Sequence, residues 1–409
     1  MLIGAGVLGA TSAAATLATS VAGKPAVSAT QRPTTRLVSV SNRSKLANGP
    51  SAAVAVSAGG RYVLFNSTAD NLVRGDTNGV EDVFIRDLRR GTTRRVSIAT
   101  KGHQGNGASA ATSMSADGRF VVFSSLASNL VARDHNHRLD VFVRDRLRRR
   151  TVRVSVTSGG HELTGTLNGK RHRLASSQGQ ISSDGRHVLF AAVAPRVQYI
   201  VNAYVRDLPS GVAHRVTPKA GFVHPFSISA RGRFLLLAVN DSGEPYRGCL
   251  EAYIRDRARH RTHPINTNNL LDYCMSAPVM SANGRYVIVS TCADHGPSAF
   301  RFSRRTHRFA VVAKRACTVA TGVSAGGRYI VYLAGGLNHT GPLSLYWHDM
   351  KTKQVREVDL SSAGLAVGVD QKHKAPISPD GHFVAFATRR SAVSRDTNGL
   401  RDVYLRGPL

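Results

Sequence analysis

Acidic residues are scarce in this chain of 409 residues: 25 Asp and Glu stand against 55 Lys and Arg, which leaves a formal net charge of +30. Aromatic side chains make up only 6% of the sequence. Few of them lie among the arginine runs, which argues against sequence-specific nucleic-acid binding through stacked bases. No apolar run after residue 30 is long enough to cross a bilayer. These absences leave a strongly basic protein without a transmembrane span in its mature chain.

The first segment, residues 1–29, has the composition of an export signal. It carries no charged side chain before Lys24 and is dominated by Ala, Gly, Leu and Val. We expect cleavage after Val27-Ser28-Ala29, which leaves residues 30–409 as a single domain that is secreted or associated with the cell envelope. The alternative is a segment that remains as a weak anchor. GAGVLG in this segment lacks the strand, helix and acidic residue of a dinucleotide site, so that site is excluded.

A short tag of an apolar residue, Ser, a Gly-containing turn, a basic residue and an alternating strand recurs seven times. The copies are VSAGGRYVLFNS at 56, MSADGRFVVFSS at 114, ISSDGRHVLFAA at 181, ISARGRFLLLAV at 228, MSANGRYVIVST at 280, VSAGGRYIVYLA at 323 and ISPDGHFVAFAT at 377. Asp-Gly, Asn-Gly and Gly-Gly accept the positive φ of a tight turn, so each tag predicts a hairpin of strands a and b. Most tags precede a second pair, strands c and d, as in DVFIRDLRRGTTRRVSIA.

Four antiparallel strands repeated seven times predict an all-β fold, a seven-bladed β-propeller of four-stranded blades. The chain ends on a strand c, RDVYLRGPL, that has no strand d after it. TTRLVSVS at 34–41 is a strand d with no blade before it, and it matches TTRRVSIA at 92–99. We therefore expect the N-terminal strand to complete the last blade, which closes the ring and removes two exposed sheet edges.

These tags resemble the TolB-like group of WD-like propeller repeats, in which a blade reads Ser-x-Asp-Gly-Arg, an apolar strand, and Asp-Val-Phe-Val-Arg-Asp. The likeness covers nearly all of residues 34–409. It implies the propeller fold but no particular function, because propellers serve many unrelated tasks. TolB proper carries an additional N-terminal α/β domain that contacts the translocation machinery. The resemblance leaves no room for that domain here, so we do not carry over that role.

Arginines gather in the c–d hairpins. The a–b and c–d turns share one face of a propeller and the b–c and d–a connections share the other, so one face is expected to be strongly basic. The arginines are Arg89, Arg90, Arg94, Arg95, Arg146, Arg148, Arg149, Arg150, Arg257, Arg259, Arg261, Arg304, Arg305 and Arg308. Such a field attracts polyanions, although salt screens it over about 8 to 10 Å. We expect a protein or an anionic envelope polymer as the partner; the alternative is a solvated surface without a dedicated ligand.

Three loops before a strand c place side-chain oxygens at positions 1, 3 and 7. The loops are DTNGVED, DHNHRLD and DTNGLRD, and the residues are Asp76, Asn78, Asp82, Asp134, Asn136, Asp140, Asp396, Asn398 and Asp402. Calcium prefers such oxygen ligands, but the loops lack the bidentate Glu at position 12 of an EF-hand. The alternative is an Asx-turn, in which Asp and Asn bond their own backbone. Calcium is the one cofactor that the sequence suggests.

The chain has four cysteines, Cys249, Cys274, Cys292 and Cys317, an even number in a chain expected to be exported. Two pairs share a spacing of 25 residues, so we predict the disulfides Cys249–Cys274 and Cys292–Cys317. The alternative joins Cys274 to Cys292 and Cys249 to Cys317. No CxxC spacing occurs, which argues against zinc.

Candidate catalytic residues are few. GVSAG fits the nucleophile elbow, but that motif must join a strand to a helix, whereas here it is a copy of the hairpin tag, so Ser324 is expected in a turn. His224 is the nearest candidate for a site in the central channel. We predict a non-enzymatic binding scaffold. The alternatives are a hydrolase or lyase with a site in the central channel, and a purely structural envelope protein.

Overall fold

The repeated tags fold into the hairpins that their turn residues predict. The strands of the first blade are β2 (Ser51–Val56), β3 (Tyr62–Ser67), β4 (Asp82–Asp87) and β5 (Thr92–Arg95). They form one antiparallel sheet in the order β2-β3-β4-β5. Gly59 and Gly60, both at φ +67°, lie in the turn between β2 and β3, where a side chain would disfavour the backbone conformation.

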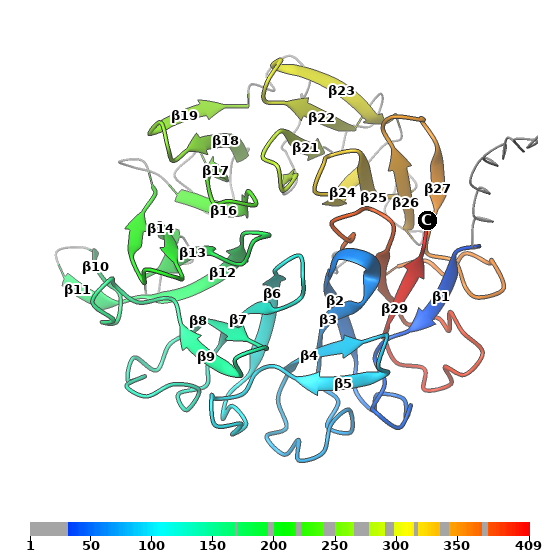
Figure 1. The fold of residues 1–409 in the computed structure, drawn as a ribbon, viewed down its shortest axis with the longest axis horizontal. Helices are drawn as coiled ribbons and strands as arrows, with labels where there is room; N and C mark the ends of the chain where they lie inside the picture. The colour runs from blue at the N-terminus through cyan, green and yellow to red at the C-terminus, as the bar shows by residue number, and fades with distance from the viewer. Residues whose placement is uncertain are drawn as a thin grey trace, which may run out of the picture. The chain divides into compact units, whose positions relative to one another are not determined.

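The computed structural model describes residues 32–167, 170–194, 200–217, 222–240, 250–265, 278–290, 298–314, 318–335, 343–369 and 375–409. Blades two to six are β6 (Ser109–Met114), β7 (Phe120–Ser125), β8 (Asp140–Asp145) and β9 (Arg150–Arg153); β12 (Ala175–Ile181), β13 (His187–Val193), β14 (Ile200–Asp207) and β15 (Ala213–Arg215); β16 (Phe222–Ile228), β17 (Phe234–Asn240), β18 (Leu250–Asp256) and β19 (Arg261–Pro264); β20 (Val279–Met280), β21 (Tyr286–Ser290), β22 (Ala299–Ser303) and β23 (Arg308–Ala313); β24 (Thr318–Val323), β25 (Tyr329–Ala334), β26 (Ser344–Asp349) and β27 (Val355–Glu357). Figure 1 shows the blades arranged in a ring, which confirms the predicted seven-bladed propeller.

The two ends of the propeller meet in the seventh blade. β1 (Thr34–Leu37) pairs antiparallel with β29 (Asp402–Gly407), and β29 pairs with β28 (Val384–Thr388). The backbone N–H of Val38 also donates to the carbonyl of Val403 at 2.8 Å. Figure 1 shows β1, in blue, beside β29, in red. The predicted closure of the ring by the N-terminal strand is confirmed.

The seventh blade departs from the four-stranded pattern at its inner position. There the chain makes a single bridge, from Ile377 to Val384, in place of a strand a. Pro376 and Pro379 flank this bridge. Proline has no N–H to donate to a ladder, which explains why pairing does not extend further.

The hydrophobic core lies between neighbouring blades. Between blades one and two, for example, Leu64 and Ile85 pack in one buried cluster with Phe123 and Phe142. Within a blade, large rings from strands b and c stack, as Phe65 and Phe84 do at 5.7 Å between centroids. Each sheet therefore buries both faces, because every blade is covered by the next one around the ring.

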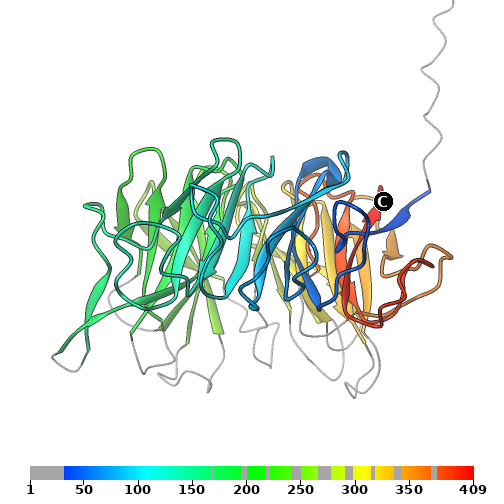
Figure 2. The same ribbon diagram turned by 90° about the horizontal axis from the view of Figure 1, so that it is seen from below.

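One hairpin was not expected from the sequence. β10 (Thr164–Leu167) pairs with β11 (Lys170–Arg173) as a separate two-stranded sheet on the connection between blades two and three. Figure 2 views the ring from its edge and shows the connections leaving the blades on two opposite faces. In the described part of the chain, no helix is both long and apolar enough for a membrane crossing.

Candidate functional site

The a–b and c–d turns lie together on one face, as predicted. The N–H of Leu88 in a c–d turn donates to the carbonyl of Arg61 in the a–b turn of the same blade at 2.9 Å. Arg146 and Arg119 repeat this bond in blade two at 3.0 Å. We call this side of the ring, formed by both kinds of turn, the turn face. The turns of the c–d hairpins, which carry the predicted arginines, lie on this face.

In four blades, the arginine of the repeated tag is neutralised by the aspartate that ends strand c of the same blade. The pairs are Arg61–Asp87, Arg119–Asp145, Arg233–Asp256 and Arg328–Asp349. In each pair Nε and Nη2 donate to the two carboxylate oxygens, and the Nη2 distances are 2.6 to 2.9 Å. This fork geometry is strong and specific. The hydrogen bond from Arg328 holds the pKa of Asp349 far below its usual value.

Some of the predicted surface arginines are bound to the protein itself. Arg146 donates to the carbonyl of Gly118 at 2.5 Å and lies 4.3 Å from the ring centroid of Tyr62. Arg304 donates through Nε to Gly284 at 2.8 Å and stacks over Phe234. These contacts orient the guanidinium groups on the turn face without neutralising their charge.

Two hollows between blades open among these arginines. One, of about 330 Å³, lies between blades one and two, and its polar lining includes Asp87, Arg90, Arg94, Arg119 and Arg146. The other, of about 220 Å³, lies between blades four and five, and its polar lining includes Asp256, Arg259, Arg261, Arg304 and His307. The turn face thus presents basic hollows and not only isolated charges.

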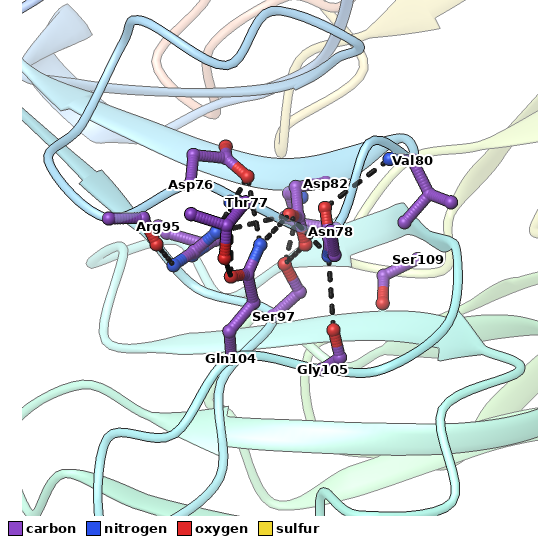
Figure 3. Close-up of polar contacts among 12 residues, drawn as sticks. Asp76, Thr77, Asn78, Val80, Asp82, Arg95, Ser97, Gln104, Gly105 and Ser109 are labelled. Atoms are coloured by element: carbon purple, nitrogen blue, oxygen red, sulfur yellow. Dashed lines mark hydrogen bonds and ion pairs between the residues drawn. The ribbon is translucent and has the colours of Figure 1, made fainter.

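Arg95 does not belong to the turn face, in contrast to the prediction. Its Nη1 lies 2.9 Å from Oδ1 of Asp76 and 3.3 Å from Oδ2 of Asp82, in the first of the three acidic loops (Figure 3). Arg95 is the last residue of β5, about 10 Å along the strand from its c–d turn, and its side chain is only 9% exposed. Its charge is therefore used inside the fold.

The first acidic loop is a hydrogen-bonded network around this guanidinium. Nδ2 of Asn78 donates to Asp82 at 3.1 Å, and Nε2 of Gln104 donates to Asp76 at 2.8 Å. The hydroxyl of Ser97 donates to the other oxygen of Asp82. Oδ1 of Asn78 accepts from the N–H of Val80, as an Asx-turn requires. Figure 3 shows these side chains converging between two connections of the chain.

The second loop repeats the arrangement in blade two. Nη1 of Arg153 lies 2.8 Å from Asp134, 3.2 Å from Asp140 and 3.6 Å from Glu162. Asn136 donates to Asp140 at 2.7 Å. Burial raises the pKa of both Asp134 and Asp140, against the effect of the arginine. A guanidinium group thus lies among the carboxylates of two of the three loops proposed for calcium.

In the third loop, no ion pair joins an arginine to Asp396 or Asp402 among the described residues. Leu37 stands on β1 where Arg95 stands on β5, and the hydroxyl of Tyr404 donates to Asp396. Asp402 accepts from the hydroxyl of Ser39, while one oxygen each of Asp396 and Asp402 is buried without a hydrogen-bond partner. Burial raises the pKa of Asp402 to about 6.

A signal in the sequence points to this difference: TTRRVSIA in blade one becomes TTRLVSVS at the N-terminus. Asn398 donates to the carbonyl of Ala47 at 3.0 Å, and its Oδ1 accepts from Leu400. The Asx-turn therefore recurs in all three loops, each with a bond from the N–H two residues on. Calcium binding stays a prediction. Within the described stretches, an arginine pairs with the carboxylates of the first two loops and not with those of the third.

The remaining sequence candidates are the cysteines and Ser324. Cys249, Cys274, Cys292 and Cys317 all fall outside the described residues, so the disulfides stay predictions. The hydroxyl of Ser324 accepts from the N–H of Tyr329 inside the hairpin, as Ser115 does from Phe120.

The central channel has a volume of about 370 Å³ at the described residues. Its lining there consists of apolar side chains with Ser, Thr and Gln, and contains no titratable group. His224 on β16 lies beside Phe226, and burial lowers its pKa. The described part of the channel therefore offers a binding cavity of low charge.

No protein-family model matches this chain, and no curated protein matches it. Among solved structures, an oligogalacturonate lyase from Vibrio parahaemolyticus is similar at a TM-score of 0.58, with 10% identity over 92% of this chain and 96% of that chain. The β-propeller domain of the Trilobed protease from Pyrococcus furiosus is similar at a TM-score of 0.54, with 11% identity over 88% and 94%. TolB from Acinetobacter baumannii is similar at 0.44, with 14% identity over 86% and 81%.

These comparisons correct the prediction that the chain is not an enzyme. Two of the similar structures are oligogalacturonate lyases, so this architecture carries an enzyme elsewhere, and the scarcity of catalytic motifs does not exclude activity here. Identities of 10 to 14% carry over neither that activity nor the role of TolB. The chain is a β-propeller whose fold is shared with the oligogalacturonate lyases and the propeller domain of the Trilobed protease.

Proposed function

We propose that this propeller, after export, binds an anionic polymer of the cell envelope through its turn face. The observation that carries the proposal is a set of arginines that line the two hollows, Arg90, Arg94, Arg259 and Arg261. In the part of the chain that the structure describes, none of the four forms an ion pair with a carboxylate. Their charge is thus available to a ligand.

The charge balance supports this reading. Many arginines of the chain have partners within the fold, such as Arg86 and Arg144, which are only 7% and 6% exposed. Arg144 donates to the carbonyl of Ala99 and the hydroxyl of Thr151. Part of the net charge of +30 therefore lies on buried guanidinium groups bonded within the fold, whereas Arg90, Arg94, Arg259 and Arg261 line open hollows. Fixed guanidinium groups bind phosphate and carboxylate groups in a two-pronged geometry.

A binding titration with defined polymers tests the proposal. Labelled inorganic polyphosphate and polygalacturonate are titrated with residues 30–409 at low and high sodium chloride. We expect binding at low salt that weakens steeply at high salt, because released counterions drive it. Alanine at the four arginines of the hollows should weaken binding at least tenfold. An affinity that changes neither with salt nor with these substitutions would contradict the proposal.

A matched control removes the same charge from the opposite face. The control carries alanine at Arg43, Lys45, Lys170 and Arg171, all exposed on d–a connections. Both variants lose four positive charges, so a non-specific field would weaken binding equally in the two. A larger loss in the turn-face variant separates a localised site from net charge.

The second candidate is an enzyme that cleaves such a polymer at the central channel. The observation that favours it is the similarity in architecture to oligogalacturonate lyase. The same polygalacturonate samples therefore receive a second readout, the appearance of new chain ends with time. Cleavage that survives alanine at the arginines of the hollows would favour a separate catalytic site.

A further inference from the structure

Blade five breaks the pairing of tag arginine and aspartate. In the four paired blades the aspartate lies directly across from the tag aromatic, as Asp87 does from Tyr62 and Asp256 from Phe234. In blade five the residue across from Tyr286 is Ser303. The tag arginine is still present, as Arg285. The carboxylate that would neutralise it is replaced by a hydroxyl.

The other two blades do not share this combination. Blade three keeps Asp207 across from its tag, where it lies 3.2 Å from Nε2 of His187. Blade seven has His382 in place of the tag arginine. Among the seven tags, the one in blade five therefore joins an arginine to a strand c that ends without a carboxylate.

Among the described residues, the guanidinium group of Arg285 forms no ion pair with a carboxylate, unlike its counterparts in the four paired blades. In the described stretches of blade five, 278–290 and 298–314, the sequence contains no Asp or Glu, against five Arg and one Lys. The guanidinium carbon of Arg285 lies 5.4 Å from the ring centroid of Tyr286, a contact that orients its plane. The donors that pair with Asp in four other blades are thus left for a ligand.

The neighbours of Arg285 complete an open pocket. Asn283, Arg285, Arg304 and Arg305 line a hollow of about 470 Å³ on the turn face. Two of these residues are held by the fold: Asn283 donates to Gly326 at 3.3 Å, and Arg304 is fixed by its bond to Gly284. Arg304 also lines the hollow between blades four and five, so the two basic hollows share this residue.

We propose that this pocket binds one phosphate or carboxylate group of the anionic polymer, with Arg285 donating to it as Arg233 donates to Asp256 in the neighbouring blade. The proposal rests on the proposed function and makes it specific, because it names one group of the polymer and one blade. Three arginines around one anion supply the fork geometry and charge that bind phosphate or carboxylate tightly.

The substitution Ser303→Asp tests the site by restoring the pair. Asp at this position is native in five other blades and pairs with the tag arginine in four of them, so the variant should fold and place a carboxylate on Arg285. We expect the dissociation constant for inorganic polyphosphate to rise about tenfold, the loss of one strong charge-assisted contact. The matched control, Ser303→Ala, removes the hydroxyl without adding a charge and should bind like the wild type. Thermal melts confirm that both variants are folded.

The outcomes separate this inference from the proposed function. Wild-type binding with an unchanged Ser303→Asp variant overturns the pocket and leaves the turn face as the binding surface. No wild-type binding to polyphosphate or polygalacturonate at low salt overturns both. An equal loss in Ser303→Ala also overturns the pocket, since the hydroxyl would then be the contact. Polyphosphate and polygalacturonate distinguish a phosphate from a carboxylate ligand, and tighter binding of oligothymidylate than of either polymer overturns the assignment to an envelope polymer.

Discussion

Replacing Tyr404 by Phe tests how the third acidic loop is stabilised without an arginine. Phe stands at this position in blades one and two, so the ring itself fits the stack with Phe386. The substitution removes the hydroxyl that donates to Asp396, a residue that is only 4% exposed. A hydrogen bond to a charged buried group contributes about 1.5 to 3 kcal/mol. We expect Tyr404→Phe to lower the free energy of unfolding by about 2 kcal/mol.

A second substitution should reverse this loss. Leu37 occupies the strand position that Arg95 occupies in blade one, and it is 2% exposed. Leu37→Arg alone crowds a buried guanidinium against the hydroxyl of Tyr404 and should destabilise the chain. In the double variant, Arg at position 37 can pair with Asp396 and Asp402 as Arg95 pairs with Asp76 and Asp82. We expect the double variant to lie within about 1 kcal/mol of the wild type.

Urea titrations monitored by circular dichroism measure the free energy of unfolding of the wild type, the two single variants and the double variant. The coupling between the two substitutions is the quantity of interest, because it compares the double variant with the sum of the single ones. A double variant that loses as much as both single variants together would refute the view that tyrosine and arginine substitute for each other in these loops. An unchanged Tyr404→Phe variant would refute the role of its hydroxyl.

Three further predictions concern Asp359, the third acidic loop and Arg144. Burial raises the pKa of Asp359 from 3.8 to about 6, so the folded chain favours the protonated form of this carboxyl group. The free energy of unfolding should therefore fall by about 3 kcal/mol as the pH rises from about 4 to about 7. Urea titrations should no longer show this fall in Asp359→Ser. Calcium bound at the third loop should raise the melting temperature. Asp402→Asn should abolish this rise, whereas Asp76→Asn should preserve it. A rise that is lost in Asp76→Asn would contradict the assignment to the third loop. Arg144→Met should lower the free energy of unfolding by about 2 kcal/mol, because its buried bonds to a neighbouring loop are lost, whereas the exposed Arg148→Met should change it by less than about 0.5 kcal/mol in the same titration.

The fold could be predicted because its signals are local. A Gly-containing turn and an alternating strand act between residues that are close in the chain, so each tag predicts its hairpin alone. The closure by β1 was also visible, since a strand c without a partner and a strand d without a blade can only complete each other. The short inner part of blade seven was missed, although Pro376 and Pro379 were the local reason for it.

The role of each charged residue could not be predicted in the same way. Arg95 and Arg94 are neighbours in one arginine run, yet one lies in the acidic loop and the other lines a hollow on the turn face. Arg285 reads like every other tag arginine until Ser303 is found opposite its aromatic neighbour. These differences arise because each arginine and the residue that decides its role lie on different strands or loops.

By itself the sequence determined the number of blades, the strand order within them and the meeting of the two ends, because turn chemistry and period-two alternation set these features locally. The tertiary structure alone decided which charges are neutralised and which remain open. An ion pair depends on the distance between two side-chain ends at a scale of about 3 to 4 Å, and that distance is set only when strands and loops far apart in the chain have packed.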